Sequence, residues 1–200
     1  MVSARELPIT LAAIVSLGAV ALALIVGMDV GEQAGLAARW TARVGLPIFL
    51  IAYSASSLVR LWPTDLWKSV LRHRRQWGLA FAFTHSVHLV ALIAALEINN
   101  ETRPLQVYLA AGGAYALMYL MALTSSDASQ KALGVWWKRL HTVGIHWIWF
   151  IFAFSYFGRV MDPERMTQGV AGFALCMGAL GLRIAAWAVA KRRRVSASPV

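Results

Sequence analysis

Long apolar runs separated by short polar segments make up most of this chain. A helix needs about 20 apolar residues to cross the hydrocarbon core of a bilayer. Six runs approach that length, and they predict membrane-spanning helices over residues 8–28, 46–61, 77–96, 105–123, 137–157 and 169–190. The pattern therefore predicts an all-α integral membrane protein whose single domain, residues 8–190, is a six-helix bundle.

The composition supports this prediction and excludes several other classes of protein. Of the 200 residues, 59% are hydrophobic and 14% are charged, which is more apolar surface than a soluble domain buries. The only cysteine, Cys176, lies in an apolar run, so this chain holds neither a disulfide nor a cluster ligated by several cysteines. No glycine-rich nucleotide-binding pattern is present, and flavin or nicotinamide chemistry would therefore need a partner chain.

The distribution of cations predicts the orientation of the chain in the membrane. With six spans, the two termini share one side with the loops after the second and fourth spans, and most Lys and Arg residues fall there. The positive-inside rule then places both termini in the cytoplasm. The segment 191–200, KRRRVSASPV, is predicted to be a basic, disordered cytoplasmic tail. The net charge of +10 does not indicate nucleic-acid binding, because no soluble basic domain is present.

The loop between the fourth and fifth spans contains the sequence SSDASQKALGVWWKRL. Ser126 or Asp127 is a suitable residue to cap a helix. We therefore expect a short helix here that lies at the membrane surface.

Four of the five histidines lie within two of the predicted spans, His85 and His88 in one and His141 and His146 in the other. An ionisable side chain inside a membrane is costly and usually faces the interior of the helix bundle. Imidazole is a common axial ligand of haem iron, and facing helices of a bundle often hold such cofactors. Two histidines fill both axial positions of the iron, which favours electron transfer over oxygen binding.

The residues alone leave the pairing of these histidines open. His85 and His88 are three residues apart and share a helix face, whereas His141 and His146 are separated by about 140° around the helix. Counted from the flanking cations at about 1.5 Å per residue, His85 lies roughly 15 Å and His146 roughly 10 Å along their helices. Depth therefore favours His85 with His146.

Two segments carry a resemblance to a known family, RRQWGLAFAFTHSVH and TSSDASQKALGVWWKRLH. Over residues 46–156 the chain resembles the ferric reductase-like transmembrane domain and the related haem-binding subunit of the bacterial periplasmic methionine sulfoxide reductase system. The resemblance implies a six-helix fold and a b-type haem held by histidines on the two corresponding helices. Matched by position, it implies His88 and His141 as the first-choice iron ligands. The alternative pair, His85 with His146, is the one that depth favours.

One position departs from the family pattern. The related subunits tend to carry a further histidine where this chain has Phe154, which cannot bind iron. We therefore expect one haem b. The alternative of two haems that use all four histidines stays open.

These observations predict a haem b electron-transfer protein of the bacterial inner membrane, acting as an oxidoreductase component. Electrons would come from a quinol or a cytoplasmic flavin reductase and would leave to ferric iron or a periplasmic partner reductase. The alternative is a transporter or an assembly factor without haem. Against a transporter, the predicted spans lack the acidic residues typical of proton or cation pathways. The nearest ones, Glu97 and Asp162, lie near span ends.

Overall fold

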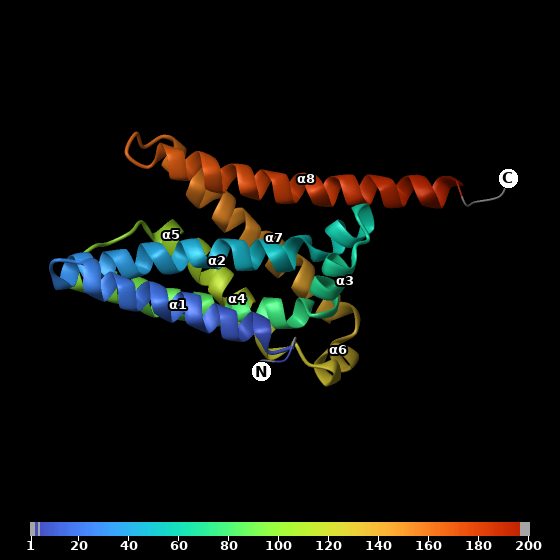
Figure 1. Ribbon diagram of the computed structural model, residues 1–200, viewed down its shortest axis with the longest axis horizontal. Helices are drawn as coiled ribbons and strands as arrows, with labels where there is room; N and C mark the ends of the chain where they lie inside the picture. The colour runs from blue at the N-terminus through green and yellow to red at the C-terminus, as the bar shows by residue number, and fades with distance from the viewer. Residues whose placement is uncertain (1–2, 4, 197–200) are drawn as a thin grey trace. The chain divides into compact units, whose positions relative to one another are not determined.

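The computed structural model describes residues 3 and 5–196, and within that part of the chain every regular element is a helix (Figure 1). The eight helices are α1 (Leu7–Val26), α2 (Val30–Leu61), α3 (Asp65–Arg72), α4 (Arg74–Ile98), α5 (Leu105–Leu123), α6 (Asp127–Leu133), α7 (Val135–Val160) and α8 (Met166–Ser196). Six of them, all except α3 and α6, are long and apolar enough to cross a membrane. The prediction of an all-α integral membrane protein with six spanning helices is confirmed.

Two helices differ in extent from the sequence prediction. α2 begins at Val30 rather than near Leu46, because residues 30–45 are rich in good helix formers and bury a stripe of small residues despite their charges. α8 continues to Ser196, so the basic residues after Ala190 are helical where a disordered tail was predicted. Lys and Arg favour helix, and no Gly or Pro interrupts this stretch. Residues 197–200 of the predicted tail lie outside the described residues.

The short helix predicted between the fourth and fifth spans is present as α6. Ser126 is its N-cap, and the Ser126 hydroxyl accepts a hydrogen bond of 3.0 Å from the backbone N–H of Ser129. This is the capping interaction that the sequence predicts, because a serine oxygen satisfies a backbone donor that the first turn leaves exposed.

The chain packs as two units, which are described separately. The first unit contains the residues up to Phe49 together with Arg75–Ile151, and the second contains Leu50–Arg74 together with the residues from Phe152 onward. Helices α2 and α7 contribute residues to both units.

In the first unit, small side chains allow α1, α2 and α4 to pack closely (Figure 1). The core of this contact consists of alanines, namely Ala23 of α1, Ala34, Ala37 and Ala38 of α2, and Ala91 and Ala95 of α4. Inside a bilayer the hydrophobic effect does not drive helices together, so close van der Waals contact between small residues carries the association. The buried hydroxyls of Ser16 on α1 and Thr84 on α4 are 3.0 Å apart and add a polar contact.

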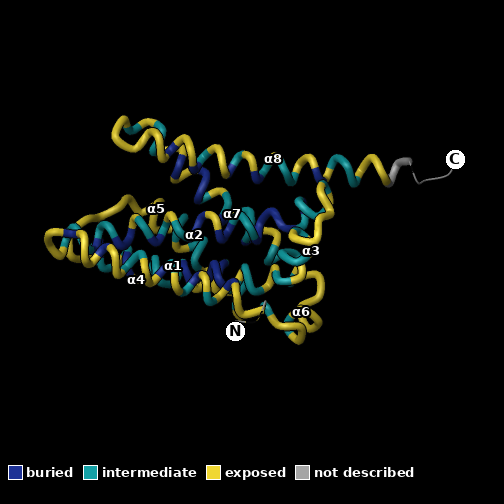
Figure 2. Tube along the Cα trace, viewed as in Figure 1, coloured by how far each residue is buried: buried dark blue, intermediate teal, exposed yellow. Residues whose placement is uncertain are grey.

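Helices α2 and α4 run antiparallel within this contact. The Asn99 side chain at the end of α4 donates to the carbonyl of Gly31 at the start of α2, at 3.2 Å. Further along, His88 of α4 meets Thr41 of α2. By contrast, α5 is exposed along most of its length, as expected of a helix that faces lipid (Figure 2).

In the second unit, arginines join α2 to α8. The Arg183 guanidinium donates to the Tyr53 carbonyl at 2.9 Å and lies 4.5 Å above the centroid of the Tyr53 ring. Arg60 donates to the carbonyl of Ala186 at 3.5 Å. Each helix therefore supplies backbone acceptors to a cation of the other, which lowers the cost of placing these charges in a span.

The small-residue contact gives a direct prediction for the substitution Ala91→Leu. The larger side chain has no space between α4 and its neighbours, and over-packing a dense contact costs about 1–3 kcal/mol. We expect a lower thermal unfolding midpoint in detergent. The control is Ala116→Leu on the exposed surface of α5, which should leave the midpoint close to that of the wild type. Equal effects of the two substitutions would contradict this account of the packing.

Candidate functional site

Histidines of α4 form the first part of the candidate site, in the first unit. His85 and His88 are one turn apart, and their ring centroids are 5.4 Å apart. Both rings approach α2, where His85 meets Gly45 and His88 meets Thr41. The structure therefore brings these two histidines together on one face of α4, as their spacing in the sequence predicts.

The imidazole of His85 lies directly against the backbone of α2. A Cβ atom added at Gly45 would come within 2.6 Å of Nδ1 and 3.4 Å of Nε2 of His85, and Cε1 would be closer still. The ring edge that carries both nitrogens therefore faces Gly45. Phe81 and Tyr115 approach the same ring, with centroids 4.3 Å and 6.2 Å away. Glycine at position 45 is what makes space for this imidazole.

The hydrogen bond between His88 and Thr41 favours one of the two neutral forms of the His88 imidazole. Thr41 is fully buried, and its hydroxyl donates to the carbonyl of Ala37 at 2.7 Å. Its oxygen can then accept from Nδ1 of His88, which lies 3.1 Å away. A neutral imidazole that donates from Nδ1 carries its lone pair on Nε2. The contact therefore favours the form of His88 in which Nε2 can bind a metal.

The two histidines of α7 adopt the same form through backbone contacts. Nδ1 of His141 is 3.0 Å from the carbonyl oxygen of Trp137, and Nδ1 of His146 is 2.7 Å from that of Thr142. A carbonyl oxygen only accepts, so both Nδ1 atoms are donors and both lone pairs are on Nε2. His73, outside the spans, makes the same contact with Ser69 at 2.9 Å. The contact therefore fixes the tautomer but does not by itself identify a metal ligand.

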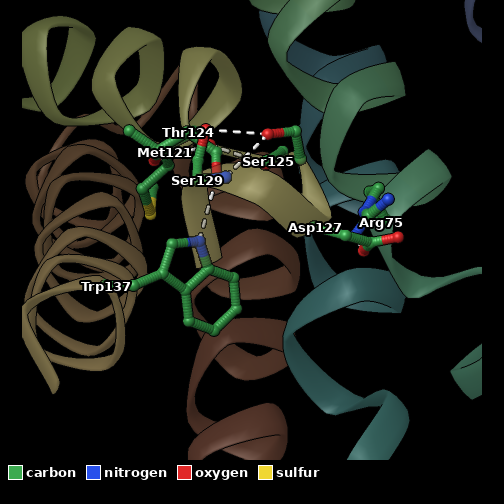
Figure 3. Close-up of polar contacts among 8 residues, drawn as sticks. Arg75, Met121, Thr124, Ser125, Asp127, Ser129 and Trp137 are labelled. Atoms are coloured by element: carbon green, nitrogen blue, oxygen red, sulfur yellow. Dashed lines mark hydrogen bonds and ion pairs between the residues drawn. The ribbon is translucent and has the colours of Figure 1, made fainter. Parts of the chain in front are cut away.

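Trp137 holds His141 in a second way. The indole and imidazole rings stack with centroids 4.0 Å apart and an angle of 27° between their planes. The indole Nε1–H donates to the carbonyl of Thr124 at 2.9 Å, at the end of α5 (Figure 3). His141 is thereby connected through Trp137 to a second helix.

An ion pair joins the start of α4 to α6 near this contact. The guanidinium of Arg75 binds the carboxylate of Asp127 (Figure 3). The hydrogen bond from Arg75, together with its charge, holds the pKa of Asp127 below its usual value. The Arg75 side chain is partly exposed and that of Asp127 largely exposed, so the pair adds orientation more than stability.

The observed helix starts can be used to compare the depths of the histidines. His85 is 85 − 74 = 11 residues after the first residue of α4, and His146 is 146 − 135 = 11 residues after that of α7. Each is about 16 Å along its helix, whereas His88 is about 21 Å and His141 about 9 Å along theirs. The match in depth between His85 and His146 that the sequence suggested is therefore retained.

Several residues of functional interest were not found from the sequence. Thr41 and Gly45 lie in the part of α2 that the predicted span 46–61 left out. Arg183 was missed although a single cation inside an apolar run is a usable signal. Tyr115 has no such signal, because only the packing shows that it lies beside His85.

Within the described residues, no three His, Cys, Asp or Glu side chains come together to hold a metal ion. The geometry therefore offers individual imidazoles on α4 and α7 rather than a multi-ligand cluster. No protein-family model matches the chain, and no solved structure matches it. The fold and the site define an all-α integral membrane protein with histidines inside its spans.

The contact between Gly45 and His85 predicts the effect of Gly45→Ala. The added methyl group would overlap the imidazole, and we expect a destabilisation of about 1–3 kcal/mol as the ring is displaced. Gly78→Ala on α4 is the matched control, because nothing lies within 4 Å of its added Cβ. That substitution should stabilise the helix by about 0.5–1 kcal/mol. Thermal unfolding in detergent measures both, and a neutral Gly45→Ala would contradict the contact.

Proposed function

We propose that this chain is a haem b-binding electron-transfer protein of the membrane, with His88 and His141 as the first-choice iron ligands. The observation that carries the proposal is that both imidazoles lie inside spanning helices with Nδ1 bound to an oxygen of the protein. Histidines that bind metals usually donate their other N–H in this way, which fixes the tautomer and the ring orientation. Both residues thus suit haem, whose iron would bind the lone pair of Nε2.

The alternative pair, His85 with His146, has support of its own. These residues match in depth, and His146 is also a donor through Nδ1. Against this pair, the nitrogen-bearing edge of His85 lies against the α2 backbone at Gly45. We therefore rank His88 with His141 first, in agreement with the resemblance to the ferric reductase-like family. The ratio of haem to protein will decide whether all four histidines bind two haems.

When bound, a haem would supply a one-electron redox couple, and His88 and His141 would hold its iron. The residues of this chain would hold and orient it. Thr41 and the Trp137 carbonyl keep His88 and His141 in the ligating tautomer. Aromatic side chains around His85 and His141 keep water away from these imidazoles.

We further propose the bacterial inner membrane as the location, with both termini in the cytoplasm. The excess of Lys and Arg beside the predicted cytoplasmic ends supports this orientation. The donor would be a quinol or a cytoplasmic flavin reductase, and the acceptor ferric iron or a periplasmic partner reductase. This makes the chain an oxidoreductase component rather than a complete enzyme.

A second candidate function is a membrane transporter or assembly factor without haem. The observation that favours it is a group of polar side chains between α4 and α5. The hydroxyls of Ser86 and Tyr119 are 3.0 Å apart, and the buried Tyr115 hydroxyl, close to His85, has no hydrogen-bond partner among the described residues. Polar groups inside a span often mark a path for protons or solutes.

The test is the optical spectrum of protein purified after expression with sufficient haem. We expect a Soret band and an α band of the b type that respond to dithionite, with one haem per chain. His88→Ala and His141→Ala should each remove most of this signal, because a single imidazole leaves one axial position unfilled. The matched control is His73→Ala, since His73 makes the same carbonyl contact outside the spans.

Three outcomes would revise the proposal. A colourless wild-type protein would exclude it and favour the transporter or assembly factor. Loss of colour only in His85→Ala and His146→Ala would move the site to the alternative pair. Two haems per chain, lost stepwise from variants of all four histidines, would establish a protein with two haems.

A further inference from the structure

We infer that Trp137 is a positioning residue that sets the plane of the His141 imidazole, and thereby the direction in which His141 would bind haem iron. The effect on haem binding rests on the proposed function, whereas the contacts between Trp137 and His141 do not depend on it. Trp137 contacts His141 through two different groups, the backbone carbonyl and the indole ring. Together they restrict the imidazole more than either contact does alone.

The two contacts restrict different motions of the imidazole. The hydrogen bond to the Trp137 carbonyl, at 3.0 Å, opposes rotation that would move Nδ1 away from the helix backbone. The indole, stacked at 4.0 Å, opposes tilting of the imidazole toward the space that the indole fills. The ring is therefore held in direction by one contact and in tilt by the other.

The indole is itself held by a different helix. Its Nε1–H donates to the Thr124 carbonyl at 2.9 Å, and the Thr124 hydroxyl donates to the carbonyl of Leu120 at 2.6 Å. Thr124 is the C-cap of α5, where backbone carbonyls lack partners within the helix. The Trp137 indole that stacks on His141 is therefore held by the end of α5, and its hydrogen bond to Thr124 is drawn in Figure 3.

A simpler explanation is that Trp137 only anchors α7 to α5, through the hydrogen bond of its indole to the Thr124 carbonyl. Trp147 provides the comparison, because it lies on the same helix and its indole donates to the Ala110 carbonyl of α5 at 3.1 Å. Its aromatic neighbour at 6.0 Å is Phe150. An anchoring role predicts similar effects at the two tryptophans, whereas the positioning role predicts an effect on the haem signal at Trp137 alone.

The experiment compares Trp137→Leu, Trp137→Phe and Trp147→Leu with the wild type in haem affinity and in the electron paramagnetic resonance spectrum of the oxidised protein. The spectrum responds to the planes of the two axial imidazoles. For Trp137→Leu we expect roughly 10-fold to 100-fold weaker haem binding, as for loss of other groups that orient a metal ligand, and a shifted low-spin signal. Trp137→Phe keeps an aromatic face and should recover part of both. Trp147→Leu should retain the wild-type spectrum.

An unchanged spectrum and affinity in Trp137→Leu, or equal changes in Trp147→Leu, would overturn the inference. Proton NMR of the protein without haem tests the positioning of His141 by Trp137 separately from haem binding. The stacked indole should shift the ring protons of His141, assigned with His141→Gln, and Trp137→Leu should remove that shift. A wild type that shows this shift but binds no haem would refute the proposed function and the ligand role, whereas absence of the shift would refute the positioning itself.

Discussion

The hydrogen bond donated by Nδ1 of an imidazole is the constraint on which the properties of this site depend. Inside a membrane, each polar nitrogen must find a partner in the protein, because water is not there to provide one. His88, His141 and His146 each meet this requirement at Nδ1. The same bond places the lone pair on Nε2, the nitrogen through which the proposed haem would be bound.

That arrangement depends on how closely the helices approach. Alanines of α1, α2 and α4 bring the backbones near enough for α4 to place its histidines against α2. Glycine at position 45 gives space to His85, and Thr41, one turn earlier, meets His88. Small residues and buried polar contacts therefore act together, as is common for helices packed in a bilayer. The polar side chains of the second unit follow the same rule, since Arg183 and Arg60 use backbone carbonyls of the facing helix.

The sequence predicts the parts of this structure that depend on local pattern. Apolar runs indicated all six spanning helices, and the three-residue spacing placed His85 and His88 on one face. The sequence also offered Ser126 or Asp127 as a capping residue, and Ser126 is the N-cap of α6. Hydropathy could not place the start of α2, because the charged residues of its first half hide a buried stripe of alanines. It also missed Arg183, since the acceptor that makes a cation tolerable there is a carbonyl on another helix.

The candidate site was predictable in its residue type but not in its geometry. Four histidines in two apolar runs pointed to imidazole chemistry, yet the roles of Thr41 and Gly45 follow only from contacts between helices. The role of Trp137 follows from its stacking on His141 within α7 and its hydrogen bond to Thr124 of α5. Those contacts rank the histidines, because they distinguish an imidazole held by a buried hydroxyl from one pressed against a backbone.

The most direct measurement is ¹⁵N NMR of histidine-labelled protein before and after haem is added, with Thr41→Val as the reference for His88. The account predicts that His88 and His141 carry their proton on Nδ1 without haem. It also predicts that haem changes the Nε2 resonances of these two residues, and that Thr41→Val releases the tautomer of His88 alone. A proton on Nε2 of either residue, or haem-induced changes confined to His85 and His146, would contradict it.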